Sequence, residues 1–316
     1  MQKKMAFVFP GQGSQTVGMG KDLIERYPIA RKTFEEADEA LGFSISKLCF
    51  EGPEADLRLT FNTQPAILTV SVAAYRILAE HDLKPTIAAG HSLGEYSALV
   101  ASGALAFADA VRLVRKRGQF MQEAVPVGEG AMAAIMGLDG EEIVAICKKV
   151  EAAGGVAVQA VNFNCPGQIV IAGDTKGVEA AIVATKAAGA KRAIPLPVSA
   201  PFHSSLMKPA AERLKVALDD VTIGASTFPV VSNVSAEPVT DGDTIRKLLV
   251  AQAASPVRWI ESVETIGRTG CELFVEVGPG RVLTGFTKKI LKEATNLNVE
   301  DIASLEKTLD YFREVR

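Results

Sequence analysis

The sequence predicts an α/β protein in which a large domain with a mostly parallel sheet carries a smaller, inserted domain. Three observations favour this fold. Short apolar runs of strand length alternate with segments whose apolar residues recur at helical spacing. Between residues 131 and 196 these segments follow a strand–helix–strand–strand–helix–strand order. The length of 316 residues also exceeds the common size of a single domain, so an insertion or a second domain is expected.

Composition and charge describe a soluble globular chain from a reducing compartment. Hydrophobic residues make up 48% and charged residues 22% of the chain, which suffices for a buried core. A formal net charge of −3 without a basic run indicates no nucleic-acid partner. Four separated cysteines without a C-x-x-C pair argue against disulfides and a zinc site, and favour the cytoplasm. The apolar stretches are too short for a signal peptide or a membrane span, so no membrane partner is expected.

The first part of the large domain is predicted from five segments. An apolar strand over Met5–Phe9 stops at a proline and leads into the glycine-rich loop Gly11–Gln15. Apolar residues at helical spacing predict a helix over Pro65–Glu80. A short strand over Pro85–Ala89 and a helix over Glu95–Ala101 follow. The strand therefore ends, and the helix begins, on either side of a short connecting motif.

The small domain is predicted from six elements in βαββαβ order, the ferredoxin-like signature. These elements are the strand Ala131–Met136, the helix Gly140–Ala152, the strand Val156–Val161, the strand Gln168–Ala172, the helix Thr175–Ala188 and the strand Arg192–Leu196, with a turn at Asn164–Gly167. We expect residues 128–197 to form this domain, and residues 1–127 and 198–316 to form the large one. The large domain is predicted to resume with a buried strand over Leu273–Val277 and to end in a helix from Val282 onward.

The motif Gly90-His91-Ser92-Leu93-Gly94 lies between the predicted strand and helix. This layout is typical of the nucleophile elbow of α/β-hydrolases, where two glycines permit a sharp turn that exposes the serine oxygen. The helix that follows offers free N–H groups and a positive dipole end to an oxyanion. The elbow favours an α/β-hydrolase-like large domain and a nucleophilic Ser92. Alternatively, Ser92 and Glu95 form a capping box, in which the hydroxyl only satisfies helix amides.

A serine nucleophile requires a base, and the chain has three histidines. His81 lies in a polar segment and is expected at the surface, while His91 adjoins the serine and would project elsewhere from a strained elbow. His203 lies in a proline-flanked loop after the last strand of the small domain and follows the serine, as the base does in elbow enzymes. His203 is therefore the predicted base, with a structural capping role as the alternative.

The sequence contains no distinctive acid for a complete triad. Acidic residues between Ser92 and His203, such as Asp109, Asp139 and Asp174, lie in no sequence context that distinguishes one of them as the triad acid. A main-chain carbonyl is the other group that could orient the base.

An arginine interrupts the apolar stripe of a helix predicted over Ala110–Met121. Ala110, Val114, Arg117 and Met121 fall on one face of this helix. A buried guanidinium requires an anionic partner, and arginine suits a bidentate carboxylate. Arg117 therefore binds either a substrate carboxylate or an internal Asp or Glu. The neighbouring basic residues are expected to point towards solvent, namely Arg112, Arg115 and Lys116.

Several separate motifs, in order and over nearly the whole chain, resemble those of the malonyl-CoA:acyl-carrier-protein transacylases and the related acyltransferase domains of polyketide synthases. The motifs are Phe9-Pro10-Gly11-Gln12-Gly13-Ser14-Gln15, Thr63-Gln64-Pro65-Ala66, Gly90-His91-Ser92-Leu93-Gly94-Glu95-Tyr96, Arg117-Gly118 with Phe120-Met121-Gln122, Val161-Asn162-Phe163-Asn164, Pro197-Val198-Ser199 leading to His203, and Glu276-Val277-Gly278-Pro279-Gly280.

The resemblance implies an acyltransferase that moves malonyl from malonyl-CoA to the phosphopantetheine thiol of acyl carrier protein for fatty acid synthesis. In this family pattern Ser92 carries the malonyl group and His203 is base and then acid. The backbone N–H groups of Gln12 and Leu93 form the oxyanion hole, and Arg117 binds the free malonyl carboxylate. The two half-reactions give ping-pong kinetics.

The same resemblance assigns supporting roles to residues around these groups. The main-chain carbonyl of Gln252 orients the histidine, which removes the need for a triad acid. Asn162 lines the pocket, with His91 and Met121 also in contact with substrate. Phe202 is similar to the malonyl-selecting pattern, although the residues before it, Ala200 and Pro201, differ from that pattern. Malonyl-CoA and holo-acyl carrier protein are the only small-molecule and protein partners implied, with no cofactor, no metal and a monomeric chain.

Two other functions share some of these sequence features. A serine esterase or thioesterase shares the elbow but passes the acyl group to water; Arg117 and the missing triad acid argue against it. A nucleotide-binding role is suggested by the N-terminal glycines, but position 16 is Thr and breaks G-x-G-x-x-G, and Gly18–Asp22 lacks the Ser or Thr of a P-loop.

Overall fold

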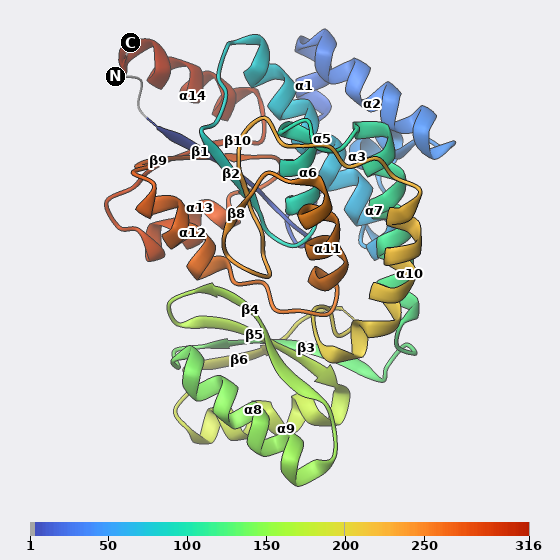
Figure 1. Ribbon diagram of the computed structural model, residues 1–316, viewed down its shortest axis with the longest axis vertical. Helices are drawn as coiled ribbons and strands as arrows, with labels where there is room; N and C mark the ends of the chain where they lie inside the picture. Colours follow the sequence, from blue (N-terminus) through green and yellow to red (C-terminus); the bar gives the residue numbers. More distant parts are fainter. Residues whose placement is uncertain (1–3, 199, 316) are drawn as a thin grey trace.

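The computed structural model describes residues 4–198 and 200–315 and contains two separate sheets within a mixed α/β architecture (Figure 1). In Figure 1 the larger sheet and most helices occupy the upper part, and the smaller sheet with two helices lies below. Ser199, which belongs to one of the motifs above, lies outside the described residues, as do residues 1–3 and 316 of the predicted large domain.

The larger sheet has six strands in the order β10-β9-β1-β2-β7-β8. Neighbouring strands run parallel except for the antiparallel pair β7 and β8. The strands are β1 (Met5–Phe9), β2 (Ile87–Gly90), β7 (Val230–Val231), β8 (Pro238–Val239), β9 (Leu273–Val277) and β10 (Thr295–Val299). In register, Phe9 at the end of β1 lies opposite Gly90 at the end of β2. The loops after these two strands therefore start side by side.

Helices cover both faces of this sheet, because the side chains of β1 alternate between two apolar cores. Phe7 and Phe9 pack with α5, α6 and α7, whereas Ala6 and Val8 pack with α12 and α13. The helices around the sheet are α1 (Lys21–Arg26), α2 (Pro28–Leu41), α3 (Ile45–Glu51), α4 (Glu54–Leu57), α5 (Thr60–Glu80), α6 (Gly94–Ala101), α7 (Phe107–Glu123), the 3-10 helix η1 (Ser205–Met207), α10 (Lys208–Asp219), α11 (Gly242–Gln252), α12 (Trp259–Arg268), α13 (Val282–Ile290) and α14 (Ile302–Val315).

The smaller sheet is antiparallel, with the order β4-β5-β3-β6. Its elements are β3 (Gly130–Met136), α8 (Gly140–Gly154), β4 (Val158–Cys165), β5 (Gln168–Asp174), α9 (Thr175–Ala187) and β6 (Arg192–Pro195). One face packs on α8 and α9, with Ile135 and Ile171 in this core. The other face contributes Met132 and Val170 to a core with Met121 of α7. The small sheet therefore packs against the C-terminal end of α7, just beyond Arg117.

The strand Met5–Phe9 and the helical stripe of α7 are confirmed, since Ala110, Val114, Arg117 and Met121 are all buried. The prediction that the chain ends in one helix from Val282 onward is wrong. After α13 the chain forms β10, which pairs with β9 at the sheet edge, and then α14. Only Val299 of this strand is fully buried and Thr295 is exposed, so Leu297 and Val299 form too short an apolar pattern to mark a strand.

Three smaller predictions also change. Strand β4 continues to Cys165 where a turn was expected, and α5 begins at Thr60, before Pro65. Proline removes one helix hydrogen bond, and the freed Phe61 carbonyl accepts a hydrogen bond from Arg115 Nη1 (3.4 Å). Arg115 is only half-exposed as a result and stacks on the Phe61 ring, contrary to the solvent position expected for it. Among the described residues, no helix is long and apolar enough to cross a membrane.

Candidate active site

Ser92 occupies a sharp turn between β2 and α6, where its backbone has a φ of 52°. A positive φ is strained for a residue with a side chain. Both glycines of the motif are sterically required: a Cβ on Gly90 would lie 1.9 Å from the Gly94 carbonyl, and one on Gly94 would lie 2.0 Å from the Phe9 oxygen. The geometry is therefore that of an elbow, packed against the end of β1.

Asn233, which lies in the loop after β7, holds the elbow in this conformation. Its Oδ1 accepts a hydrogen bond from Ser92 N (2.7 Å), and its Nδ2 donates to Gly90 O (2.7 Å). The side chain is fully buried, so both bonds are shielded from water. These contacts supply hydrogen bonds to two backbone groups of the turn, Ser92 N–H and the Gly90 carbonyl.

The capping-box interpretation of Ser92 and Glu95 is wrong. Helix α6 has no side-chain cap, and Ser92 Oγ instead contacts His203 and Arg117. The Glu95 carboxylate accepts from Asn233 rather than from the serine N–H. The hydroxyl is therefore free of helix capping and available for chemistry.

Ser92, His203 and the main chain of Gln252 form a linear relay. Ser92 Oγ lies 2.7 Å from His203 Nε2, and His203 Nδ1 lies 2.9 Å from the Gln252 carbonyl oxygen. A carbonyl oxygen only accepts, so Nδ1 carries the proton and Nε2 accepts from the serine hydroxyl. Burial, together with the nearby positive charge of Arg117, lowers the pKa of His203 to about 3. The imidazole is thus held neutral, as a base requires.

Arg117 projects from α7 into the same region and is only 1% exposed. Nη1 donates to Gln64 Oε1 (2.7 Å), and Nη2 donates to Gln252 Oε1 (2.9 Å) and to Ser92 Oγ (3.2 Å). Its Nε has no partner among the described residues. The guanidinium makes no ion pair with a described carboxylate, so the internal salt bridge weighed above is absent there.

Glu95 completes a buried network behind the elbow. Its Oε2 accepts from Gln252 Nε2 (2.7 Å) and from Asn233 N (3.0 Å). Burial raises the pKa of Glu95 to about 7, while these donors and the charge of Arg117 act in the opposite direction. The Gln252 side chain therefore contacts a guanidinium with its oxygen and a carboxylate with its nitrogen.

Two main-chain N–H groups stand free beside Ser92. Gln12 and Leu93 both line the cavity at the serine, and their N–H groups donate no hydrogen bond to any residue that the structure describes. They come from the loops after β1 and β2, which the parallel pairing brings together. Two free donors at one spot are what an oxyanion hole requires.

The cavity at Ser92 has a volume of about 110 Å³ and lies between the elbow and the small sheet. It is lined by Gln12, Gln64, His91, Ser92, Leu93, Arg117, Met121, Met132, Asn162, Leu196, Val198, Phe202 and His203. A second cavity of about 220 Å³ adjoins it, because Gln12, His91, Asn162 and Leu196 line both. The two cavities are therefore neighbours, and of the two only the smaller one is lined by Ser92.

All remaining predicted site residues lie at these cavities. The buried Asn162 Oδ1 has no partner among the described residues. His91 does not face away from the cavity, as the strained elbow suggested, but lines it and contacts Asn164 Oδ1 through Nε2 (2.8 Å). Phe202 and Met121 form apolar walls. His81 is exposed, as expected.

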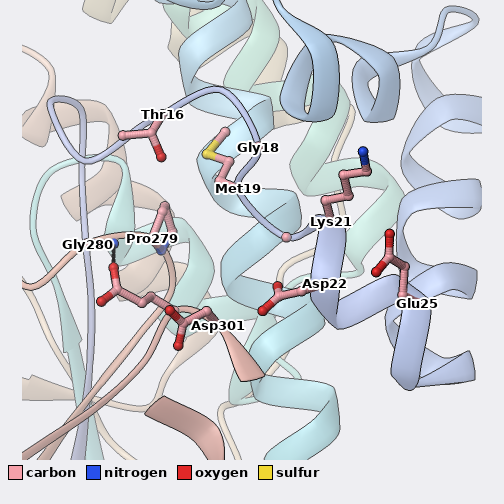
Figure 2. A pocket seen from close by; sticks show the side chains of 11 residues that line it. Thr16, Gly18, Met19, Lys21, Asp22, Glu25, Pro279, Gly280 and Asp301 are labelled. Carbon is pink, nitrogen blue, oxygen red and sulfur yellow. Dashed lines mark hydrogen bonds between the residues drawn. The ribbon is translucent and has the colours of Figure 1, made fainter. Parts of the chain in front are cut away.

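A larger hollow of about 360 Å³ lies between the start of α1 and the turn after β9 (Figure 2). Two of its carboxylates already bind neighbouring chain segments. Glu300 accepts a hydrogen bond from Gly280 N (3.0 Å) and forms an ion pair with Arg281, and Asp22 accepts from Ile302 N (2.8 Å). No cluster of His, Cys, Asp or Glu that could hold a metal occurs among the described residues. The polar lining contains no nucleophile–base pair, which distinguishes it from the cavity at Ser92.

Comparison with known proteins agrees with this geometry. A family model described as an acyl transferase domain matches residues 6–314. The chain belongs to the acyl transferase family. Within it, the malonyl CoA-acyl carrier protein transacylase of Bacillus subtilis (strain 168) is 52% identical, over 98% of this chain and 98% of its own length.

Solved structures of acyl transferases superpose closely on the chain. The acyl carrier protein S-malonyltransferase of Vibrio cholerae has a TM-score of 0.94 at 50% identity and covers 97% of this chain and 100% of its own. A malonyl-transacylase in complex with a type II polyketide synthase acyl-carrier protein has a TM-score of 0.95 at 50% identity, covering 98% and 100%.

Sequence reasoning missed the residues that support this acyl transferase site from a distance. Gln64 binds Arg117, and Asn233 binds the elbow, yet neither was assigned a role. Gln64 stands within a motif quoted above, which is a usable signal. Asn233 lies 141 residues from Ser92 in the chain, in a segment without any recognised motif. Glu95 was read only as a helix-capping residue.

Proposed function

We propose that this acyl transferase moves the malonyl group from malonyl-CoA to the phosphopantetheine thiol of acyl carrier protein, through a malonyl ester of Ser92. The observation that carries the proposal is the Ser92–His203–Gln252 relay beside a buried guanidinium with no carboxylate partner among the described residues. The relay can carry out acyl transfer, and a guanidinium without a carboxylate partner favours a substrate that has a second carboxylate.

In the first half-reaction, Ser92 Oγ attacks the thioester carbonyl of malonyl-CoA and His203 Nε2 takes its proton. The carbonyl oxygen becomes an oxyanion that the N–H groups of Gln12 and Leu93 receive; one such donor contributes about 2.7–4 kcal/mol in well-studied enzymes. The carbon–sulfur bond then breaks, and the coenzyme A thiolate takes the proton from Nε2. The products are free coenzyme A and the malonyl ester of Ser92.

The second half-reaction reverses these steps with another thiol. The phosphopantetheine thiol gives its proton to His203 Nε2, its sulfur attacks the ester carbonyl, and Ser92 leaves and regains the proton. The depressed pKa of His203 keeps the imidazole neutral between the two halves. The two thiols use one cavity in turn, which predicts ping-pong kinetics.

The pocket walls fit a small acyl group with one charged end. Arg117 lines the cavity and its Nη2 lies 3.2 Å from Ser92 Oγ, so the guanidinium is within reach of a three-carbon acyl chain on the serine. Asn162 and His91 line the wall shared with the larger chamber, and Phe202 and Met121 close the apolar sides. No cofactor or metal takes part in these steps; malonyl-CoA and holo-acyl carrier protein are the reactants.

We also propose a domain division and a cellular setting. Residues 128–197 form a ferredoxin-like domain, supported by the order β4-β5-β3-β6, within an α/β-hydrolase-like domain of residues 1–127 and 198–316. The chain works in the cytoplasm, in support of which all four cysteines are free and buried, and we propose that it does so as a monomer. The malonyl-carrier product serves fatty acid synthesis; one relative of similar structure is instead bound to a type II polyketide synthase acyl-carrier protein.

The deciding experiment is to incubate the protein with malonyl-CoA and record the intact mass. A malonyl adduct is expected, located on Ser92 by peptide mapping and released mainly to a phosphopantetheine thiol. Ser92→Ala should carry no adduct. Rapid release of malonate to water would support the esterase alternative, and an adduct that persists in Ser92→Ala would refute the assignment of the serine.

A further inference from the structure

Glu95 carries a buried carboxylate that the reaction above does not use. It lies in the first turn of α6 and is 3% exposed. No lysine, arginine or histidine among the described residues forms an ion pair with it. A buried carboxylate of this kind is costly unless a positive charge nearby offsets it.

Arg117 carries a buried positive charge that likewise has no ion-pair partner among the described residues. Its guanidinium is buried, its hydrogen bonds go to two amide oxygens and one hydroxyl, and it lies over the Tyr96 ring (5.4 Å), so none of these partners is a carboxylate. The Gln252 side chain connects the two charges: Oε1 accepts from Arg117 Nη2 (2.9 Å), and Nε2 donates to Glu95 Oε2 (2.7 Å). The amide dipole is therefore aligned between a cation and an anion, which stabilises both.

We propose that Glu95 is the counter-charge of Arg117, held one amide group away so that it balances the guanidinium without occupying the edge that binds substrate. The inference rests on the proposed function. A direct ion pair would fill the donors of Arg117, whereas the observed arrangement leaves Nε unpaired. Glu95 is thus a positioning residue that acts through Gln252 and touches no substrate atom.

The negative charge of Glu95 also weakens the binding of a substrate carboxylate by Arg117. A malonyl group must be held firmly enough to be selected, yet released to a second thiol in every cycle. Uniformly tighter binding of the acyl-enzyme would slow the second half-reaction. Glu95 weakens the net field at the malonyl carboxylate and has far less effect on an acetyl group, which carries no charge.

The test is Glu95→Gln, which removes the charge and keeps the hydrogen bonds. Asn233 N and Gln252 Nε2 both donate to the same oxygen, Oε2, so a glutamine oxygen in that position still accepts both. Because burial raises the pKa of Glu95 to about 7, the ratio of kcat/KM for malonyl-CoA to that for acetyl-CoA is measured at about pH 8, where the carboxylate is mostly ionised. It should rise about tenfold, which corresponds to losing one unit charge at a separation of about 12 Å and an effective dielectric constant of about 20. The malonyl-enzyme should also accumulate in the steady state.

Glu276→Gln is the control for removing a buried carboxylate elsewhere in the chain. Glu276 is fully buried, its Oε1 accepts from Leu283 N (3.0 Å) and its Oε2 from Thr284 N (2.7 Å), and burial likewise raises its pKa to about 7. Glutamine keeps only one of these two bonds, so a lower Tm is expected for this variant. Glu276 does not line the cavity at Ser92. Its replacement should leave the malonyl-to-acetyl ratio within about twofold of the native value, as for independent sites.

An unchanged or lower ratio in Glu95→Gln, with the native protein still forming its malonyl adduct, would overturn the inference and leave the proposed function intact. Absence of the adduct in the native protein would refute the proposed function instead. Glu95→Asp retains the charge and provides a second comparison should Glu95→Gln not fold. Its ratio should stay within about twofold of native, because the field at Arg117 is kept; a tenfold rise would overturn the inference.

Discussion

Truncation of Arg117 should lower malonyl transfer much more than acetyl transfer. Arg117→Ala removes a guanidinium that is 1% exposed and lies 3.2 Å from Ser92 Oγ. A malonyl carboxylate bound by two charge-assisted hydrogen bonds would lose about 3 kcal/mol at the low end of the usual range, or roughly 150-fold in kcat/KM. Acetyl transfer loses only the contact with Ser92, about tenfold or less.

The same substitution has a cost in stability that the assay must separate. It leaves the Gln64 and Gln252 side-chain oxygens without their buried donor, at about 1–3 kcal/mol each. We therefore expect a lower Tm as well as altered selectivity. Arg117→Lys should recover part of the malonyl activity, since it retains the charge but not the planar fork.

Single-turnover formation of the acyl-enzyme, followed by intact mass with malonyl-CoA and with acetyl-CoA, measures the two losses. Arg115→Ala is the control, because it removes another arginine of α7 that stacks on Phe61 and does not line the cavity. Its activity should stay within about twofold of native for both substrates. An equal loss for malonyl and acetyl transfer in Arg117→Ala would refute the carboxylate-binding role.

Four further outcomes are expected. Asn233→Ala removes both bonds that hold the elbow and should lower the free energy of unfolding by about 2–4 kcal/mol, with a fall in kcat; unchanged urea unfolding would contradict the role of Asn233 in holding the turn. The pKa of His203 lies below its ordinary value, so acyl-enzyme formation should remain on its plateau at pH 6, and a decline with an apparent pKa near 6.5 in a single-turnover pH series would argue against a buried neutral base. In the unfolded chain histidine takes up its proton near pH 6.5, whereas folded His203 does so only near pH 3. The contribution of His203 to stability should therefore be complete above pH 6.5 and be lost as the pH falls towards 3. Thermal unfolding of the native and His203→Ala proteins across this pH range measures it. Phe202→Ala should enlarge the apolar wall and raise methylmalonyl relative to malonyl transfer; a constant ratio would show that the ring does not exclude the methyl group.

Short-range patterns were enough to predict the elbow and the helix that carries Arg117. Gly90 and Gly94 are required by contacts within a few residues and with the end of β1, so their spacing around Ser92 is visible in the sequence. The burial of Arg117 follows from helical periodicity alone. By contrast, β10 was missed because the apolar pattern of this partly buried edge strand is too short to mark it.

The sequence by itself determined which groups could do the chemistry: a serine on a glycine-flanked turn, a histidine in a later loop and an arginine on an apolar face. Only the tertiary structure decided that they meet. His203 joins Ser92 across 111 residues and Gln252 across 49, while Asn233 and Glu95 stand behind them. The physical reason is that helix and turn preferences depend on neighbours along the chain, whereas these contacts depend on strand order. The parallel alignment of β1, β2 and β7 brings their carboxyl ends, and the loops that follow, to one edge of the sheet.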